Sequence, residues 1–466
     1  MAYTLEQENI FSSALNMQIN EILSITAPAG SGKTFTLVEL SKKLHNSKIL
    51  YLAYNKAMQI DAKKRFPKNV DVKTIHGLAF SFLNLDIKLL KNGDYTAFDI
   101  STMFNIDLDT AIMALNAFNN FCNSNLTGFK KRDCNDFTFI RIAYEFYKKM
   151  RHKEISITHN FYLKDFQLFL LKNGNQFEYD YVLLDEAQDS NEVTLSIFKT
   201  FNAKKIFVGD PNQAIYSFRG SVNAFDKLIA NYEMQLSACY RCSNEIIEQA
   251  NLLLSKFKKN PIIIYSKQKE TNHNIITSAK ITRTNANIIE QLNQSIETNF
   301  DYTLLRHPKE IFNTTLNIVH FLKNNRDKVD YNAFPFLKNL SNEIALKNLL
   351  NDMKDIELSA SYKMAKRYGS YIFRIYYFAL ENYKNRKINK NYILTAHTSK
   401  GLEFDKVELL TDFPNIFDLK NSIIDNNLQD EQKLQEEVNL YYVAITRAKY
   451  ILIDNTKNKE ILCQMP

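Results

Sequence analysis

The segment from residue 27 to residue 34 reads Ala-Pro-Ala-Gly-Ser-Gly-Lys-Thr. It follows an apolar run and opens a helical pattern, which is the context of a phosphate-binding P-loop. Two glycines let the backbone approach a phosphate closely, and the first N–H groups of the helix would point at it. The alternative is a chance glycine-rich turn, since Ala27 stands where the strict pattern has glycine. The residues predicted to line the phosphate site are Ala29, Gly30, Ser31, Gly32, Lys33 and Thr34.

Two adjacent carboxylates follow another apolar run, in Leu183-Leu184-Asp185-Glu186. We expect Asp185, together with Thr34, to hold Mg²⁺, and Glu186 to orient or deprotonate the attacking water. Phosphoryl transfer depends mainly on such positioning, on a metal and on neutralisation of charge. Taken alone, the two carboxylates could equally be a helix cap and a surface charge. Combined with the P-loop, they predict a nucleoside triphosphatase rather than a kinase or a small-molecule transferase.

The predicted phosphate-site residues and the two carboxylates can meet only if buried strands bring them to one edge of a sheet. Short apolar runs followed by a turn and a helical stretch are typical of buried parallel strands, with function at their carboxyl ends. The runs are residues 22–27, 49–53, 182–184 and 206–208, and helical patterns over 34–44 and 56–65 follow the first two. The sequence therefore predicts an α/β fold with parallel sheets. Residues 81–174 and 299–387 are mostly helical in periodicity, which indicates two helical insertions.

Composition narrows the class of protein. The chain has 466 residues, 45% hydrophobic and 24% charged, so we expect a globular protein of about three domains rather than a fibrous or disordered one. A net charge of +8 permits an anionic partner but does not require one. Five cysteines suit a reducing cytoplasm, and the Cys239/Cys242 pair lacks a second pair for a zinc site. No secretory signal or membrane-spanning run is visible, so we expect no membrane partner.

Further segments resemble, in order, the motifs of superfamily-one DNA helicases of the UvrD/Rep type. Residues 185–189 (Asp-Glu-Ala-Gln-Asp) resemble motif II, and residues 208–220 resemble motif III. Tyr240-Arg241 resembles motif IV, and residues 395–404 and 441–449 resemble motifs V and VI. Residues 55–57 look like motif Ia, and residues 74–76 like the motif that follows it. The resemblance spans nearly the whole chain. The chain is similar in kind to the smaller members of the family, such as F-box DNA helicases and phage-defence helicases.

The resemblance implies two RecA-like motor domains, each carrying a helical insertion. The first motor domain would comprise residues 1–80 and 175–232, with its insertion at 81–174. The second would comprise residues 233–298 and 388–466, with a reduced insertion at 299–387. After Lys449 only 17 residues follow, which is too few for a nuclease domain, so strand cutting would need another protein.

The resemblance also assigns roles at the nucleotide. Gln7 and Tyr240 would hold the adenine of ATP, Glu403 would take the ribose hydroxyls, and Gln213 would touch the γ-phosphate or the attacking water. Arg241 and Arg447 would act as arginine fingers, which neutralise charge on the transferred phosphoryl group. Four of these residues have simpler alternatives when taken alone. Gln7 could be an exposed glutamine near a terminus, Tyr240 a core aromatic and Arg241 a surface cation. Arg447 could lie on a solvated helix face. The residues with predicted catalytic roles are Lys33, Asp185, Glu186, Gln213, Arg241 and Arg447.

For a single strand of DNA, the resemblance implies contacts from Asn55, Thr74, His76, Phe218, Arg219, His397 and Ser399. Single-strand sites combine backbone-contacting polar groups with aromatic platforms. The chain has no Trp, so Phe218 would have to stack on a base, unless it is simply a core residue. His76 and His397 could instead be satisfied buried histidines, and they lack metal-ligand spacing. Lysine clusters such as residues 130–132 add a diffuse attraction for phosphates.

We therefore expect an ATP-dependent DNA translocase and helicase acting on single strands or on single/double-strand junctions, with the 3′→5′ polarity that the family implies. Two alternatives stay open. The chain could be a DNA-stimulated ATPase subunit that serves a separate nuclease, for example in phage defence. It could also be a nucleotide-dependent interaction switch that binds no nucleic acid.

Overall fold

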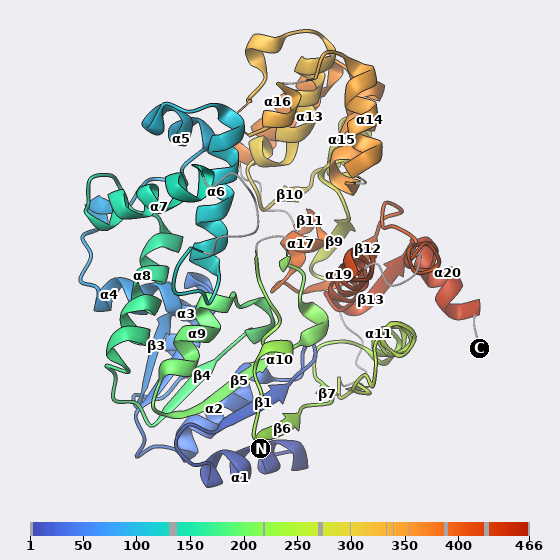
Figure 1. Cartoon of the computed structure of the whole chain (residues 1–466). Coiled ribbons are helices and arrows are strands. Elements are labelled where there is room, and N and C mark those ends of the chain that lie inside the picture. The colour runs from blue at the N-terminus through green and yellow to red at the C-terminus, as the bar shows by residue number, and fades with distance from the viewer. Residues whose placement is uncertain are drawn as a thin grey trace. The chain divides into compact units, whose positions relative to one another are not determined.

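The computed structural model describes residues 3–129, 138–217, 220–268, 274–298, 300–331, 333–338, 340–353, 355–385, 390–423 and 428–464, the last range without the side chains of 428, 429, 463 and 464. The chain divides into two compact units, an N-terminal unit, Met1–Ser237, and a C-terminal unit, Ala238–Pro466. Each unit is built around its own parallel sheet (Figure 1). The predicted α/β class with two parallel-sheet domains is confirmed.

The sheet of the N-terminal unit has six strands in the order β3-β2-β4-β5-β1-β6, and all its neighbours pair in parallel. Its central strands are fully or almost fully buried, as their continuous apolar runs predicted. The strands are β1 (Ile22–Thr26), β2 (Ile49–Ala53), β3 (Val70–Thr74), β4 (Tyr181–Leu184), β5 (Lys204–Gly209) and β6 (Tyr232–Gln235). The four predicted strands are thus present, at nearly the predicted bounds.

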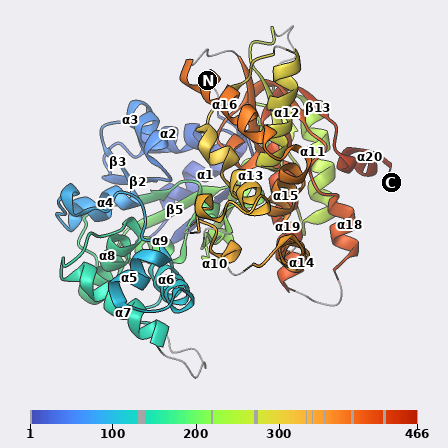
Figure 2. The ribbon, with the colours of Figure 1, turned by 90° about the horizontal axis from the view of Figure 1, so that it is seen from above.

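Helices cover both faces of this sheet (Figure 2). On one face α1, α2 and α3 pack against the side chains of Leu23, Ile25 and Tyr51, and on the other α4 and α9 pack against those of Leu50 and Leu52. This alternation follows from the period of two along a strand. The helices are α1 (Leu5–Asn16), α2 (Lys33–Lys43), α3 (Lys56–Arg65), α4 (Ile75–Phe82), α9 (Glu192–Thr200) and the short α10 (Ala224–Lys227). The described part of this unit also contains the 3₁₀ turns η1 (Ile87–Leu89), η2 (Ala187–Asp189) and η3 (Pro211–Gln213).

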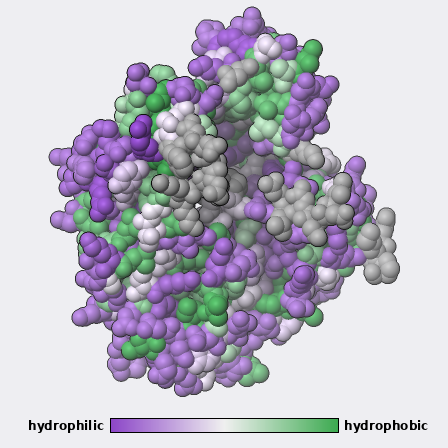
Figure 3. Space-filling view, viewed as in Figure 1, coloured by the Kyte–Doolittle hydropathy of each residue, from purple (hydrophilic) through white to green (hydrophobic). Residues whose placement is uncertain are grey.

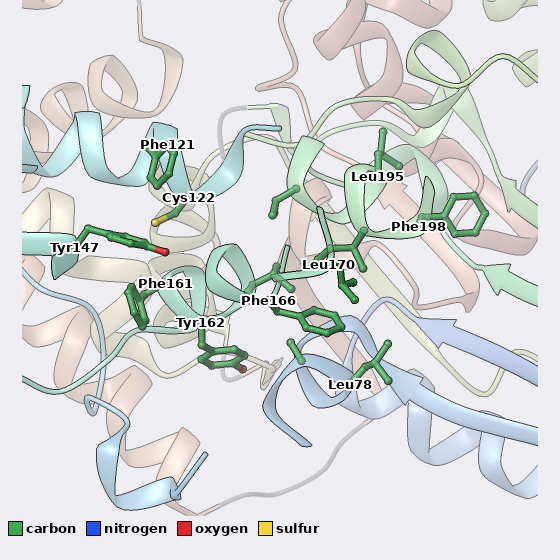
Figure 4. Packing of buried hydrophobic residues seen from close by; sticks show 14 of the residues in the cluster. Leu78, Phe121, Cys122, Tyr147, Phe161, Tyr162, Phe166, Leu170, Leu195 and Phe198 are labelled. Carbon is green, nitrogen blue, oxygen red and sulfur yellow. The ribbon is translucent and has the colours of Figure 1, made fainter. Parts of the chain in front are cut away.

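The first insertion is helical, as predicted, and shares a core with one face of the sheet (Figure 4). It comprises α5 (Ala97–Phe104), α6 (Leu108–Asn123), α7 (Thr138–Arg151) and α8 (His159–Asn173). Aromatic rings dominate its interior, and Phe146 meets Phe118 edge to face at 4.8 Å. The buried Lys164 donates from Nζ to the backbone oxygens of Ser124 and Leu126 and to Gln167 Oε1. This lysine therefore ties the chain that leaves α6 to α8.

The sheet of the C-terminal unit has five parallel strands in the order β10-β11-β9-β12-β13. They are β9 (Ser278–Thr282), β10 (Thr303–Leu304), β11 (Asn391–Thr395), β12 (Phe404–Leu409) and β13 (Ala448–Asp454), and β7 (Ala238–Cys239) and β8 (Tyr265–Ser266) form a separate pair. Around them lie α11 (Asn244–Phe257), α12 (Asn285–Thr298), α17 (Ala396–Ser399), α18 (Ile416–Asn421), α19 (Leu428–Ile445) and α20 (Lys457–Gln464).

The second insertion is also mostly helical. It contains α13 (Pro308–Leu322), α14 (Glu343–Met353), α15 (Ile356–Tyr368) and α16 (Tyr371–Asn385), with 3₁₀ turns η5 (Arg326–Lys328) and η6 (Pro335–Leu337). Its apolar side chains form one cluster with those of α12 and with Ile393 of β11. Among the described helices of the whole chain, none has both the length and the hydropathy needed to cross a membrane. Hydrophilic residues dominate the face drawn in Figure 3, with apolar ones scattered between them.

Candidate active site

The loop between β1 and α2 has the geometry of a phosphate cradle. Gly30 and Gly32 have φ angles of 71° and 80°, a left-handed conformation that a glycine adopts without strain. Gly32 is the N-cap of α2 and supplies no side-chain cap, so the first N–H groups of the helix keep their capacity to bind an anion. The hydroxyl of Ser31 is buried and has no hydrogen-bond partner among the described residues. A buried donor without a partner is costly, and a phosphate oxygen fits it.

Lys33 and Glu186 lie side by side. The Nζ atom of Lys33 is 3.6 Å from Oε1 of Glu186, and both side chains are largely buried. The strand order explains this contact, because β1 and β4 both flank β5 and their carboxyl ends lie at the same edge of the sheet. The structure therefore brings the P-loop cation and the second acidic residue of motif II together.

Asp185 follows β4 directly and is almost fully buried. Its Oδ1 accepts the backbone N–H of Glu186 at 2.8 Å, and its Oδ2 accepts the hydroxyl of Tyr51. Burial, and then the neighbouring charge of Glu186, raise the pKa of Asp185 above its ordinary value. A buried carboxylate of this kind gains from a bound cation. With the hydroxyl of Thr34 at the first turn of α2, these oxygens fit a hard divalent cation such as Mg²⁺.

A chain of hydrogen bonds links motif II to motif III. Gln188 donates from Nε2 to Oε2 of Glu186 at 2.5 Å, and its Oε1 accepts the backbone N–H of Asp210 at 3.1 Å. Gln213 in turn donates from Nε2 to Oδ2 of Asp210 at 2.7 Å. The amide of Gln188 fits only because residue 209 is glycine, since a Cβ there would lie 2.2 Å from Gln188 Oε1. Gln188 had no predicted role, although it lies within the motif at residues 185–189.

Gln7 is buried, so the alternative of an exposed terminal glutamine is wrong. Its Oε1 accepts the backbone N–H of Thr4, and the hydroxyl of Thr4 accepts the backbone N–H of Gln7 in return, which forms a capping box at α1. Its Nε2 donates to the hydroxyl of Thr36 in α2 at 3.1 Å. The structure thus joins Gln7 to the helix that follows the P-loop, and its contact with adenine stays a prediction.

In the C-terminal unit, Arg447 is only 1% exposed, so the alternative of a solvated helix face is wrong. It lies in the turn between α19 and β13. Its Nε donates to the carbonyl of Val443 at 2.9 Å, and another guanidinium nitrogen donates to the carbonyl of Leu402 at 3.2 Å. Backbone carbonyls therefore hold this cation in one orientation.

Arg241 pairs with Glu403, which also pairs with Lys449. The distances are 2.8 Å from Nε of Arg241 and 3.1 Å from Nζ of Lys449 to the two carboxylate oxygens. Although burial opposes it, the charge of Arg241 and the hydrogen bond from Lys449 lower the pKa of Glu403 below its ordinary value. Tyr240, beside Arg241, is 49% exposed, so the core alternative is wrong for this ring.

Two buried thiols flank Tyr240-Arg241. The backbone N–H of Cys242 lies 3.4 Å from Sγ of Cys239, and Sγ of Cys242 donates to the carbonyl of Thr446 at 3.7 Å. Neither side chain has exposed surface. The cysteine pair therefore packs the segment that carries Arg241 against the segment that carries Arg447.

Three residues of the N-terminal unit that are predicted to contact DNA lie at helix N-termini. Asn55 caps α3 by accepting the N–H of Met58, and Thr74 caps α4 by accepting the N–H of Gly77. His76 is partly exposed, and its Nδ1 is buried without a hydrogen-bond partner in the described part of the chain. The alternative of a satisfied buried histidine is thus wrong for His76. Burial, and then the charge of His159, lower the pKa of His76 to about 4.

The ring of His76 lies 5.9 Å from that of His159 and 5.7 Å from that of Tyr162, both on α8 of the insertion. Neither residue of α8 had a predicted role, and no motif in the sequence pointed to them. In the C-terminal unit, His397 is half-buried in α17, and the buried hydroxyl of Ser399 donates to the carbonyl of Ala396. Phe218 and Arg219 lie outside the described residues.

Two family models match the chain, an AAA domain over residues 7–219 and a UvrD-like helicase C-terminal domain over residues 311–457. F-box DNA helicase protein 1 of Schizosaccharomyces pombe is 30% identical over 97% of this chain and 57% of its own length. F-box DNA helicase 1 of Gallus gallus is 25% identical over 98% of this chain and 49% of its own length. A probable DNA helicase II homolog of Mycoplasma genitalium is 25% identical over 61% of this chain and 56% of its own length.

The chain thus spans about half the length of the curated relatives it matches. The matches cover both units, including the P-loop, motif II and motif VI. They agree with the two parallel sheets and with the order of the motifs along the chain. In its matched models, its relatives and the order of its motifs, the chain is similar to UvrD/Rep-type superfamily-one DNA helicases.

Proposed function

We propose that the protein hydrolyses ATP to move along single-stranded DNA, in the 3′→5′ direction, and to separate duplex strands ahead of it. The observation that carries this proposal is the connected polar chain of the N-terminal unit. It runs from Lys33 through Glu186, Gln188 and Asp210 to Gln213. Such a chain lets a change at a γ-phosphate alter motif III, which also carries the predicted DNA contacts Phe218 and Arg219.

Each residue has a defined task in the proposed hydrolysis. Lys33 and the N–H groups of Ala29 to Thr34 bind the β- and γ-phosphates, and Gln7 and Tyr240 hold the adenine. Thr34 and Asp185 would hold Mg²⁺, which would neutralise charge on the phosphate oxygens. Glu186 accepts the proton of the attacking water, and Gln213 orients that water or the γ-phosphate. Glu403, already paired with Arg241, takes the ribose hydroxyls.

Arg241 and Arg447 act as the arginine fingers, which can be worth about 10³–10⁵ in rate. Both belong to the C-terminal unit, whereas the P-loop and motif II belong to the N-terminal unit. Hydrolysis would therefore require residues of both units. That dependence is the proposed source of directed movement along the DNA strand.

The track for DNA is proposed from Asn55, Thr74 and His76 in the N-terminal unit and from His397 and Ser399 in the C-terminal unit. The support in the structure is the placement of the first three at the N-termini of α3 and α4, where the positive end of the helix dipole favours a phosphate backbone. The lysine clusters of the sequence would add an attraction that weakens with salt, although residues 130–132 lie outside the described residues.

The test is ATPase activity with and without single-stranded oligonucleotides, followed by strand displacement on duplexes with a 3′ or a 5′ tail. We expect stimulation by DNA, displacement only with a 3′ tail, and loss of ATPase in Lys33→Ala and Arg447→Ala. Absence of stimulation by DNA, or full activity of Lys33→Ala, would refute the proposal. DNA-stimulated ATPase without strand displacement would favour a subunit that serves a separate nuclease. Failure to bind oligonucleotides at low salt would favour the interaction switch.

A further inference from the structure

Tyr51 places a hydroxyl inside an otherwise apolar strand. The five residues of β2 are all buried, and Tyr51 is only 1% exposed. Its ring packs against Phe66 with centroids 4.5 Å apart, so the aromatic part has an ordinary packing role. The hydroxyl needs a separate explanation, because phenylalanine would fill the same space without a buried polar group.

The hydroxyl of Tyr51 reaches Asp185 across the sheet. In the parallel pairing of β2 with β4, Tyr51 lies opposite Leu183, and Asp185 follows two residues later, on the same face as Leu183. A long aromatic side chain can span such a diagonal. The hydroxyl donates to Oδ2 of Asp185, while the backbone N–H of Glu186 donates to Oδ1 at 2.8 Å.

Each oxygen of the Asp185 carboxylate thus has one fixed donor, one from β2 and one from the backbone. An ionised carboxylate offers about four lone-pair sites, so each oxygen keeps a lone pair for a cation or for water bound to it. Two donors from rigid elements fix the rotation of the carboxylate group. Outer partners of this kind typically orient the residues that bind metals.

We propose that Tyr51 is a positioning residue for the binding of Mg²⁺–nucleotide, and that its hydroxyl holds the Asp185 carboxylate in the orientation that the cation requires. The inference rests on the proposed function, in which Asp185 holds Mg²⁺. Tyr51 itself touches neither the phosphates nor the attacking water in this proposal. Its loss should therefore act on the dependence on Mg²⁺ and leave the contacts of the nucleotide with the P-loop in place.

The test compares Tyr51→Phe with wild type in the full chain. The affinity for a fluorescent ATP analogue that resists hydrolysis is measured once with Mg²⁺ and once with EDTA. We expect the affinity in EDTA to change less than about 2-fold, and the apparent affinity for Mg²⁺ to fall about 10–100-fold, as for other outer partners of metal ligands. The ATPase rate at low Mg²⁺ should fall and should recover in part as Mg²⁺ is raised.

Tyr181→Phe is the matched control. Tyr181 is also a buried tyrosine of the same sheet, and its hydroxyl donates to the carbonyl of Ala14 rather than to Asp185. It should leave the dependence on Mg²⁺ unchanged. Should Tyr51→Phe fold poorly, Tyr51→Met removes the same hydroxyl and fills the space with a flexible apolar chain.

The outcomes separate the two proposals. If wild type binds the analogue equally in Mg²⁺ and in EDTA, Asp185 holds no functional Mg²⁺, and the proposed function fails together with the inference. If wild type depends on Mg²⁺ but Tyr51→Phe matches it, or if the control shifts as much as Tyr51→Phe, only the role of Tyr51 is refuted. Equal weakening in Mg²⁺ and in EDTA would likewise assign Tyr51 to packing alone.

Discussion

Gly209→Ala should disrupt the link between motif II and motif III. The Cβ of an alanine would lie 2.2 Å from Oε1 of Gln188 and 3.2 Å from the backbone nitrogen of Ala187. The first distance is far below contact, so the amide of Gln188 has to leave its place. That displacement breaks its bond to the Glu186 carboxylate and the bond that it accepts from the Asp210 N–H.

The magnitude follows from those two bonds. A hydrogen bond to a charged group contributes about 1.5–3 kcal/mol and one between neutral groups about 0.5–1.5 kcal/mol, so Gly209→Ala should lower the free energy of unfolding by about 2–4.5 kcal/mol. The release of Glu186 should also lower kcat of the ATPase by on the order of 10²-fold, because small displacements of a catalytic group are costly. Urea denaturation and steady-state ATPase measurements check the two figures.

A double-mutant cycle makes this reasoning refutable. Gln188→Ala removes the atom that the new Cβ would strike, so Gly209→Ala should cost much less in that background than in wild type. Gly128→Ala is the matched control, because a Cβ at Gly128 meets no described atom within 4 Å and should change stability by less than about 0.5 kcal/mol. Strictly additive effects at residues 188 and 209 would show that the close approach does not hold Gln188 in place.

Three further outcomes follow from buried polar groups. Arg447→Lys should lower the ATPase rate and also the Tm, because an ammonium group cannot reproduce the guanidinium hydrogen bonds to the carbonyls of Val443 and Leu402. An unchanged Tm would show that these hydrogen bonds do not stabilise the fold. Burial lowers the pKa of Lys164 to about 8, so between about pH 8 and pH 10.5 the unfolded chain binds more protons than the folded chain, and this lysine makes the free energy of unfolding rise with pH. Urea denaturation of Lys164→Met over this range should show a flatter rise. An unchanged slope would refute the lowered pKa of Lys164. A hydrogen bond from Cys242 lowers the pKa of the Cys239 thiol below its ordinary value, but neither thiol is exposed. Iodoacetamide should therefore label the two cysteines slowly in the native protein and fast in urea. Rapid labelling of the native protein at pH 7 would contradict their burial.

The elements that the sequence predicted well are those that local pattern determines. The short apolar runs became buried strands, and the helix predicted at 56–65 has those bounds in the structure, where Asn55 caps its beginning. The P-loop could be predicted because its glycines and its lysine are adjacent in the chain. The same holds for Asp185 and Glu186, which follow a strand directly.

The contacts that the sequence did not predict depend on strand order and on where helices end. Tyr51 meets Asp185 only because β2 and β4 are neighbours, although the insertion separates them in the chain. The alternative of a solvated Arg447 assumed that the residue continues a helix, but α19 ends at Ile445, so Arg447 does not follow the period of that helix. The burial of Gln7 likewise requires the packing of α1 beside α2.

The shared core of the first insertion has a consequence for how the N-terminal unit opens. One continuous apolar cluster includes Phe118 and Phe146 of the insertion and Val182 and Leu184 of the strand that carries Asp185. Segments that share a core tend to exchange their amide hydrogens as one cooperative unit. The helices α6 and α8 should therefore unfold with the sheet rather than before it.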